Sequence, residues 1–217
     1  MGAAMANYPF LFLDLETTGH DPLRRVGDTL VPWHEIIDMG WVLADSRDLR
    51  FIADGQVKMH PAHPERCLPR LVNNYQTRAA RGQWNEALPL SSGIRTLLEF
   101  VGRQVGPGRV TILRGQNFFF DWQFLSVACA WVGVSMAELE AYFHYSRLDN
   151  RSMAVQELFA PDTQYCPDDY SMRTSRLLEA LGIEPEPAVH TAINGARKAH
   201  EVATALNELK RARLRKA

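Results

Sequence analysis

Two acidic residues directly follow an apolar strand near the N-terminus, and this junction constrains the chain more than any other feature. The apolar run covers residues 8–13, and the next residues are Asp14-Leu15-Glu16-Thr17-Thr18-Gly19. Because alternate side chains of a strand share one face, Asp14 and Glu16 are expected to point the same way, about 6.5–7 Å apart. Neighbouring carboxylates repel each other, and a hard divalent cation such as Mg²⁺ or Mn²⁺ relieves that repulsion. The junction therefore predicts a metal site, against the alternative of a solvated strand end whose acids face water.

The bulk composition indicates one α/β domain. The chain has 217 residues, of which 46% are hydrophobic and 23% are charged, as is usual for a globular protein. We expect a single domain over residues 1–217, with flexible ends at 1–7 and 214–217. The net charge of −1 supplies no general basic field for long nucleic acid. A nucleic-acid substrate is therefore expected to be short or to be held locally.

The chain carries no pattern typical of membrane insertion or secretion. It has no stretch of about 18 consecutive apolar residues, and its first residues lack the basic and apolar regions of a signal peptide. Three widely separated cysteines, Cys67, Cys129 and Cys166, favour a reducing compartment over a disulfide framework or a zinc site. We therefore predict a cytoplasmic location and no membrane partner.

Hydrophobic patterning predicts three successive strands and then alternating helices and strands. The strands are expected at the apolar run 8–13 and at residues 35–45, 50–59, 110–113 and 142–148. Helices are expected within 65–81, from Ser91 or Ser92 to Val105, and at 118–132, 152–159, 171–181 and 195–213. Residues 19–33 are expected to form a loop. This order predicts an α/β fold with a mixed five-stranded sheet flanked by helices.

A third acid, Asp121, is expected in the first turn of the helix that follows the strand at 110–113. An acid in that turn is favoured by the helix dipole and can also face a cation. Asn117, which precedes the helix, is equally compatible with an ordinary helix cap. Asp121 is therefore either a metal ligand or a dipole-stabilising acid, and the presence of Asp14 and Glu16 favours the first interpretation.

His190 follows a proline-rich loop and precedes the last helix. Histidine side chains ordinarily titrate near neutral pH, so a histidine beside carboxylates can act as a general base. The alternative is an ordinary polar surface residue.

Together, the segments that contain Asp14, Asp121 and His190 resemble the DnaQ-like 3′–5′ exonucleases of the DEDDh group. The resemblance covers residues 8–205 and is greatest to oligoribonuclease and RNase T-like members. It implies a ribonuclease-H-like fold and a hydrolase that binds two Mg²⁺ or Mn²⁺ ions. It also implies that short single-stranded RNA or DNA 3′ ends are the substrate, and that the protein forms a homodimer.

The resemblance also implies the roles of individual residues. Asp14 would bridge two metal ions, Glu16 would hold one of them and Asp121 would support the second. His190 would deprotonate the attacking water. The implied substrate-binding residues are Leu15, Thr17, Thr18, His20, Asn117 and Tyr75. His20 stands where the family has an apolar residue that wedges the nucleotide, and the expected base-stacking aromatic is Tyr75 or Trp84, although both also suit core packing.

The family pattern fails at one ligand position. An aspartate is expected five residues after the histidine, and this chain has Gly195 there. Loss of a charged ligand could lower the rate by a few powers of ten, at ~1.4 kcal/mol per tenfold. The chain is accordingly an inactive variant, a weak enzyme, or a nucleic-acid-end or nucleotide-binding protein. Lys198, one turn further on, either replaces the missing cation or is an ordinary solvated lysine.

Overall fold

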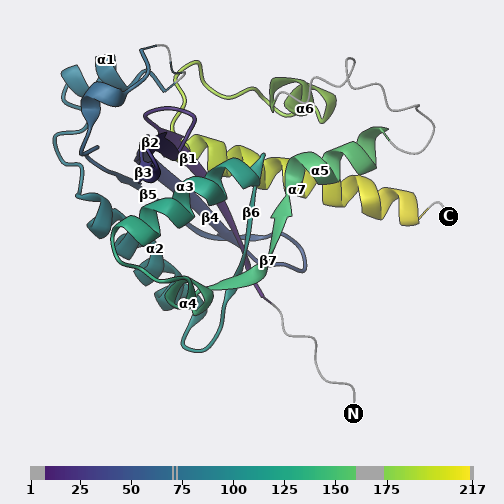
Figure 1. Cartoon of the computed structure of the whole chain (residues 1–217). Helices are drawn as coiled ribbons and strands as arrows, with labels where there is room; N and C mark the ends of the chain where they lie inside the picture. The colour runs from purple at the N-terminus through teal and green to yellow at the C-terminus, as the bar shows by residue number, and fades with distance from the viewer. Residues whose placement is uncertain (1–7, 70, 72, 160–173, 216–217) are drawn as a thin grey trace.

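A mixed five-stranded sheet forms the centre of the protein (Figure 1). The computed structural model describes residues 8–69, 71, 73–159 and 174–215. The strands of the sheet are β1 (Phe10–Thr17), β4 (Ile36–Ala44), β5 (Phe51–Lys58), β6 (Thr111–Gly115) and β7 (Phe143–Asp149). Their order is β5-β4-β1-β6-β7, with β4 antiparallel to β1 and β5, and β6 parallel to β1 and β7. The predicted mixed five-stranded sheet is confirmed.

Helices cover both faces of this sheet. The helical segments are η1 (Pro64–Arg66), α1 (Tyr75–Ala80), α2 (Leu90–Val105), α3 (Phe118–Trp131), α4 (Met136–Glu140), α5 (Asn150–Ala154), the π-helix η2 (Val155–Phe159), α6 (Thr174–Ala180) and α7 (Ala192–Leu214). In Figure 1, α2 and α3 lie on one side of β1 and α7 runs along the other side. Among the described residues, none of these helices combines the length and apolar character needed to cross a bilayer.

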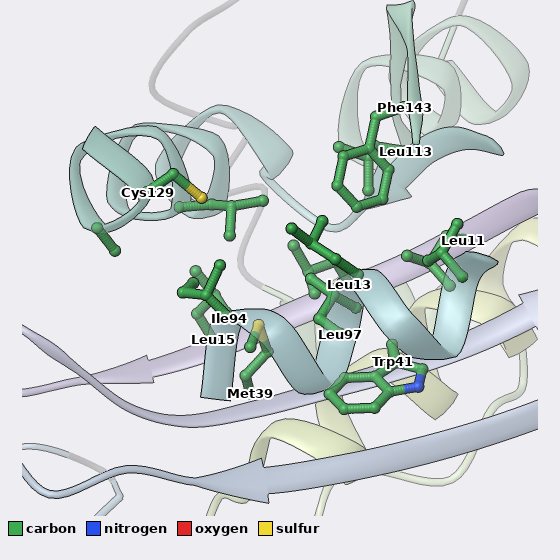
Figure 2. Packing of buried hydrophobic residues seen from close by; sticks show 14 of the residues in the cluster. Leu11, Leu13, Leu15, Met39, Trp41, Ile94, Leu97, Leu113, Cys129 and Phe143 are labelled. Carbon is green, nitrogen blue, oxygen red and sulfur yellow. The ribbon is translucent and has the colours of Figure 1, made fainter. Parts of the chain in front are cut away.

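The alternating side chains of β1 divide the interior into two cores. Leu11, Leu13 and Leu15 point into the larger core, where they pack with residues of α2 and α3 (Figure 2). Phe12 points the opposite way and packs against alanines of α7, namely Ala196, Ala199 and Ala203. Small residues on both sides allow this close approach, because a Cβ at Gly40 of β4 would overlap the backbone of α7 at Ala192. The even-numbered positions of β1 therefore lie beside the start of α7.

The predicted loop at residues 19–33 is wrong, because a hairpin forms there. Strands β2 (Leu23–Val26) and β3 (Thr29–Pro32) pair antiparallel across a two-residue turn. Gly27 supplies the positive φ of 59° that such a turn needs, and Asp28 completes it. The Gly-Asp pair between two short β-prone runs was the signal of this hairpin.

Two predicted helix starts also differ from the structure. Helix α2 begins at Leu90, after Pro89, and neither Ser91 nor Ser92 caps it. The last helix begins at Ala192, three residues before the predicted start. In both cases, packing of the apolar face extends the helix beyond the cap or glycine that the local sequence favours.

The region between β6 and α6 contains further differences. Helix α4 was not predicted; Ser135 caps it by accepting a hydrogen bond from the Glu138 amide at 3.1 Å. The helix predicted at 152–159 begins two residues earlier, because Asp149 caps it through the Ser152 amide at 2.9 Å, and it ends as η2. The predicted cap at Ser171 lies outside the described residues.

The predictions about the ends and the cysteines are only partly addressed by the structure. Residues 1–7 and 216–217 lie outside the described residues, and Leu214 is the last residue of α7. Cys67 and Cys129 are buried free thiols, whereas Cys166 lies outside the described residues.

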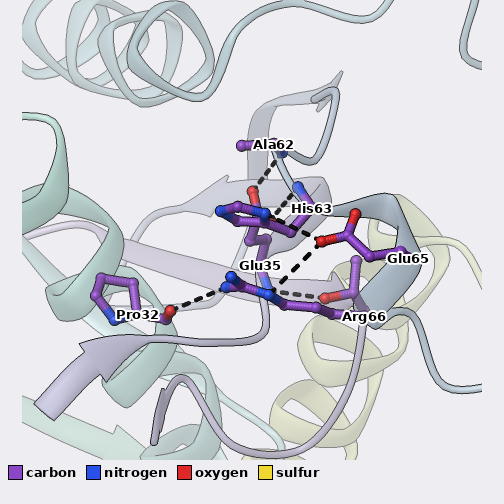
Figure 3. A network of polar contacts seen from close by, with 7 residues as sticks. Pro32, Glu35, Ala62, His63, Glu65 and Arg66 are labelled. Atoms are coloured by element: carbon purple, nitrogen blue, oxygen red, sulfur yellow. Dashed lines mark hydrogen bonds and ion pairs between the residues drawn. The ribbon is translucent and has the colours of Figure 1, made fainter. Parts of the chain in front are cut away.

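A polar network holds the segment that follows β1 in place (Figure 3). The Thr18 amide donates to the Glu35 carbonyl at 2.8 Å. The Glu35 carboxylate accepts from the amides of Ala62 and His63 at 2.6 and 2.8 Å. Arg66 donates to the Pro32 carbonyl at 3.3 Å, so the hairpin, η1 and the end of β1 form one connected unit.

Candidate active site

The end of β1 presents Asp14 and Glu16 on the face opposite the leucine core. Both residues line a single cleft, and they alternate with Leu13 and Leu15 of the larger core, so their side chains share one side of the strand. Asp14 lies directly against Gly195 of α7. Glu16 is only 8% exposed, and the neighbouring Asn73 side chain, whose amide donates to the Thr17 carbonyl at 2.9 Å, acts to lower its pKa. The strand periodicity seen in the sequence therefore accounts for this half of the site.

Asp121 enters the same cleft from the first turn of α3. Its Oδ1 accepts a hydrogen bond of 3.0 Å from the Leu15 amide, the residue between the other two acids. This bond joins the helix to β1 across 106 positions of sequence. It holds Asp121 beside β1, in the cleft that Asp14 and Glu16 also line.

His190 reaches the cleft from the loop before α7. Arg78 of α1 is buried, and its guanidinium donates to the carbonyls of Asn73 and His190 at 2.9 and 3.0 Å. The His190 ring is placed by a second contact, since its Nδ1 lies 3.3 Å from Oε2 of Glu186. The imidazole thus has a fixed backbone and a carboxylate partner.

The cleft has a volume of about 440 Å³, within the range of small-ligand sites. Four acids and one lysine, Lys198, are the charged residues of its lining, and two histidines are also present. The lining residues are Asp14, Leu15, Glu16, Thr17, His20, Leu71, Asn73, Gln116, Asn117, Phe120, Asp121, Glu186, His190, Gly195, Lys198, Ala199 and Val202. Lys198 is paired with Glu201 at 2.7 Å.

Burial raises the pKa of all three candidate metal ligands. The pKa of Asp14 lies well above its usual value of 3.8, first because of burial and then because of repulsion from Asp121 and Glu16. Burial also raises the pKa of Asp121, against an opposing hydrogen bond from Leu15. Burial raises the pKa of Glu16 to about 7, although the Asn73 hydrogen bond and Arg78 act in the opposite direction. These carboxyls therefore hold protons more tightly than free acids unless a cation offsets their charge.

The donor set fits a hard divalent cation. Within residues 8–69, 71, 73–159 and 174–215, no group of three or more His, Cys, Asp or Glu side chains is arranged so that it could hold a metal ion. The three carboxylates of Asp14, Glu16 and Asp121 nevertheless enter one cleft and destabilise one another there. Oxygen donors of this kind suit Mg²⁺ and Mn²⁺, whose charge would remove the repulsion.

Packing explains why position 195, where the family pattern has a metal ligand, is a glycine. A Cβ at this position would overlap the Asp14 carboxylate. Gly195 also continues the row of small residues by which α7 approaches β1. The missing side chain therefore makes room for Asp14, which sequence inspection had not indicated.

The predicted substrate-binding residues fall into two groups. Leu15, Thr17, His20 and Asn117 line the cleft, with Asn117 in a left-handed conformation at the start of α3. Thr18 is fully buried, and its hydroxyl accepts a hydrogen bond of 2.9 Å from the Glu35 amide.

The two aromatic candidates for base stacking lie in a separate core. Tyr75 is 8% and Trp84 3% exposed, and their rings pack edge to face at 4.9 Å. Trp84 also donates to the Ile37 carbonyl at 3.0 Å. The packing alternative is therefore the one that the structure adopts, because both rings are already covered by protein.

The sequence reasoning missed Asn73, Arg78 and Glu186. Asn73 and Arg78 belong to a segment read only as partly helical, and their roles arise from contacts with residues distant in sequence. Glu186 had one available signal: it precedes His190 by four residues, between two prolines that restrict the loop.

Sequence comparison finds an oligoribonuclease from Halorhodospira halophila (strain DSM 244 / SL1) that is 29% identical to this chain over 150 residues. The matched region covers 66% of this chain and 71% of that protein. The chain matches no protein-family model.

Structural comparison finds exonucleases across most of the chain. Exonuclease I aligns with a TM-score of 0.67 and 17% identity, over 93% of this chain and 41% of its own, so this chain spans about two fifths of that protein. The nuclease domain of 3′hExo, a DEDDh family member solved bound to rAMP, aligns with a TM-score of 0.66 and 14% identity, over 95% and 94% of the two chains. The predicted ribonuclease-H-like fold is confirmed, and so is the resemblance to DnaQ-like 3′–5′ exonucleases.

Proposed function

We propose, on the premise that this chain is a homologue of the DnaQ-like 3′–5′ exonucleases, that it hydrolyses phosphodiesters at the 3′ ends of short single-stranded RNA or DNA with the help of Mg²⁺ or Mn²⁺. The homology supports its assignment as a hydrolase of the 3′–5′ exonuclease class. One observation carries the proposal: Asp14, Glu16, Asp121 and His190 come from three separate segments of the chain and line one cleft.

The acids are proposed as the metal ligands and the histidine as the base. Asp14, Glu16 and Asp121 would hold the divalent ions. Bound ions of this kind supply Lewis-acid stabilisation of the attacking and leaving oxygens. His190 takes a proton from the attacking water, whose oxygen bonds to phosphorus as the bond to the 3′ oxygen of the preceding nucleotide breaks. The product is a 5′-mononucleotide, and the departing 3′ oxygen gains a proton from solvent.

The remaining cleft residues are proposed to hold the terminal nucleotide. Thr17 and Asn117 line the cleft with the acids, as does the exposed His20 that precedes the hairpin. A histidine ring can stack on a base, as aromatic side chains do in single-strand-binding sites. The short cleft and the net charge of −1 favour an end-directed substrate over a long duplex.

A second function is favoured by Gly195. With three acidic ligands in place of the four that the family pattern leads one to expect, the chain could bind 3′ ends or nucleotides without cleaving them, or cleave them slowly. The glycine also has a packing explanation, because a Cβ at position 195 would overlap the Asp14 carboxylate.

The test is a mass-resolved digest of labelled di- to pentanucleotides, as RNA and as matched DNA, with Mn²⁺. The wild-type protein is expected to release 5′-mononucleotides, and Asp14→Asn to lower the rate by about 10³-fold or more, roughly 4 kcal/mol of barrier. Asp28→Asn, at the exposed hairpin turn, is the matched control and should cleave at the wild-type rate.

Two outcomes would redirect the proposal. Binding of the oligonucleotides by calorimetry without any cleavage contradicts the enzyme and supports the binding protein. Neither binding nor cleavage contradicts both. If the protein cleaves or binds the oligonucleotides, comparison of the RNA and DNA substrates shows which nucleic acid it prefers.

A homodimer and a cytoplasmic location are also proposed. The first follows from the resemblance to oligoribonuclease, and the second from the three scattered cysteines. Sedimentation velocity at several protein concentrations tests the dimer, and a monomer at every concentration contradicts it.

A further inference from the structure

A proline-flanked loop carries one additional acid, Glu186, into the cleft. The loop joins α6 to α7, and its residues Glu184, Pro185, Pro187, Ala188 and Val189 are exposed. The Glu186 side chain is only 15% exposed and lines the cleft with Asp14 and His190. Because a carboxylate gains from full hydration, its inward orientation on an otherwise exposed loop calls for a partner.

That partner is the imidazole of His190. Glu186 Oε2 lies 3.3 Å from His190 Nδ1. Catalytic hydrogen bonds are often this long in ligand-free enzymes and shorten when substrate binds. The prolines on both sides of Glu186 restrict the backbone, so the contact forms without a helix between the two residues.

Other groups fix the remaining freedom of His190. Arg78 donates to the His190 carbonyl at 3.0 Å, which anchors the backbone from α1. The carboxylates of Asp14 and Glu16 share the cleft, and the charge of Glu186 acts on both. The other charged side chains that line the cleft with this pair are Asp14, Glu16, Asp121 and Lys198.

We propose that Glu186 is the positioning residue for His190: its carboxylate accepts the Nδ1 hydrogen, so that Nε2 is left as the proton acceptor facing the cleft. A hydrogen bond at one ring nitrogen selects the tautomer and orientation of the whole ring. The inference rests on the proposed function for its catalytic consequence. The tautomer itself is a property of the folded protein and needs no substrate.

Glu186 has a competing role as a replacement metal ligand. It would then restore the charge lost at position 195, and its removal would weaken metal binding as strongly as it slows cleavage. The 3.3 Å contact with His190 favours the positioning role, since it directs one carboxylate oxygen of Glu186 at the imidazole.

The experiment compares Glu186→Ala and Glu186→Asp with Glu184→Ala, an exposed acid of the same loop. Nitrogen-15 NMR of metal-free protein at about pH 8, where a free imidazole is neutral, reads the His190 tautomer. We expect Nδ1–H in the wild type and in Glu184→Ala, and a shift towards Nε2–H in Glu186→Ala. Glu186→Asp should retain part of the wild-type pattern.

Kinetics and metal binding complete the experiment. In Glu186→Ala, kcat should fall roughly 10- to 100-fold, less than the ~10²–10⁴-fold that a general base supplies, with KM and the Mn²⁺ dissociation constant within about twofold of wild type. Glu184→Ala should match the wild type in all three measurements.

The outcomes separate this inference from the proposed function. An Nε2–H tautomer in the wild type, an unchanged kcat in Glu186→Ala, or a loss of Mn²⁺ affinity as large as the loss of kcat each overturns the positioning role. A protein that cleaves nothing but shows the expected tautomer shift contradicts the proposed function and supports the Glu186–His190 contact.

Discussion

The two faces of β1 use the same backbone for opposite purposes. On one face, Leu13 and Leu15 pack into the larger core between β1, α2 and α3. On the other face, Asp14 and Glu16 line the cleft beside α7. Along this strand, the leucines therefore contribute packing energy, and the acids that alternate with them contribute buried charge. The packed leucine face thus holds the unfavourable acidic face in position, because a rigid strand cannot move its acids away from each other.

The largest expected effect is on the leucine face. Leu13 is fully buried, so Leu13→Ala leaves a cavity and should lower the free energy of unfolding by about 4 kcal/mol, within the usual ~2–5 kcal/mol. Urea denaturation measures this change. Leu30→Ala, at a residue of β3 that is 58% exposed, is the control and should alter stability by no more than ~0.5 kcal/mol. If Leu13→Ala and Leu30→Ala lowered the free energy of unfolding equally, the leucine face of β1 would not be the source of stability.

The next effect concerns pH on the acidic face. The pKa of Glu16 rises from 4.5 to about 7 in the folded protein, so the folded state binds this proton more tightly than the unfolded chain. This tighter proton binding adds to the free energy of unfolding below the unfolded-state pKa of Glu16. The added stability, on the order of 3 kcal/mol in total, is lost as pH rises through the folded-state pKa. The shifts of Asp14 and Asp121 act in the same direction.

Urea titrations of metal-free protein from about pH 4.5 to 8 measure this loss, and Mn²⁺ should restore stability at the alkaline end. Glu16→Gln should flatten the curve between the two pKa values of Glu16. If stability still falls with pH at the wild-type slope in Glu16→Gln, the titration of Glu16 is not the cause of the pH dependence.

A smaller effect of opposite sign is expected at Asp14. Asp14→Asn removes a buried charge that Asp121 and Glu16 repel, so the metal-free protein should gain stability at alkaline pH. The same variant loses the proposed activity. A destabilised Asp14→Asn would show that the carboxylate makes favourable contacts, and the contrast between the two faces would then fail.

The smallest stability change is expected at Gly195. Replacing a helical glycine by alanine gains up to about 1 kcal/mol, but a Cβ at Gly195 must displace the Asp14 carboxylate. The net change in Gly195→Ala should stay within ~1 kcal/mol while Mn²⁺ affinity falls roughly tenfold, since about 1.4 kcal/mol of ligand placement is lost.

Gly102→Ala in α2 is the matched control, because its Cβ would meet Tyr142 at a tolerable 3.4 Å. It should gain stability without any change in Mn²⁺ affinity. Unchanged Mn²⁺ affinity in Gly195→Ala would show that Asp14 adapts to the new side chain. The same pair of measurements on Gly195→Asp tests whether a fourth carboxylate compensates for the displaced one.

Much of the fold and part of the site followed from local patterns. The alternation in residues 10–16 predicted which side chains of β1 share a face, and the structure confirms it for Asp14 and Glu16. The order of strands and helices predicted the mixed sheet. The roles assigned to Asp14, Glu16, Asp121 and His190 stay predictions, although all four side chains line one cleft.

Other features had no local signal strong enough to predict them. Tyr75 was a candidate for base stacking, yet its ring is covered by Trp84, because burial of an aromatic depends on what packs over it. Arg78 reaches His190 across 112 positions of sequence, and no spacing rule connects them. The hairpin at 23–32 was missed although its Gly27-Asp28 turn was visible.

The sequence by itself determined the pattern of β1, because strand periodicity is a property of neighbouring residues and places Asp14 and Glu16 together. Tertiary structure decided what meets those acids. The row of small residues on α7 sets how closely the helix approaches, so that Gly195 accommodates the Asp14 carboxylate. The loop before α7 decides that Glu186 meets His190. The Gly195–Asp14 contact joins segments far apart in sequence, and it exists only once the helix has packed on the strand.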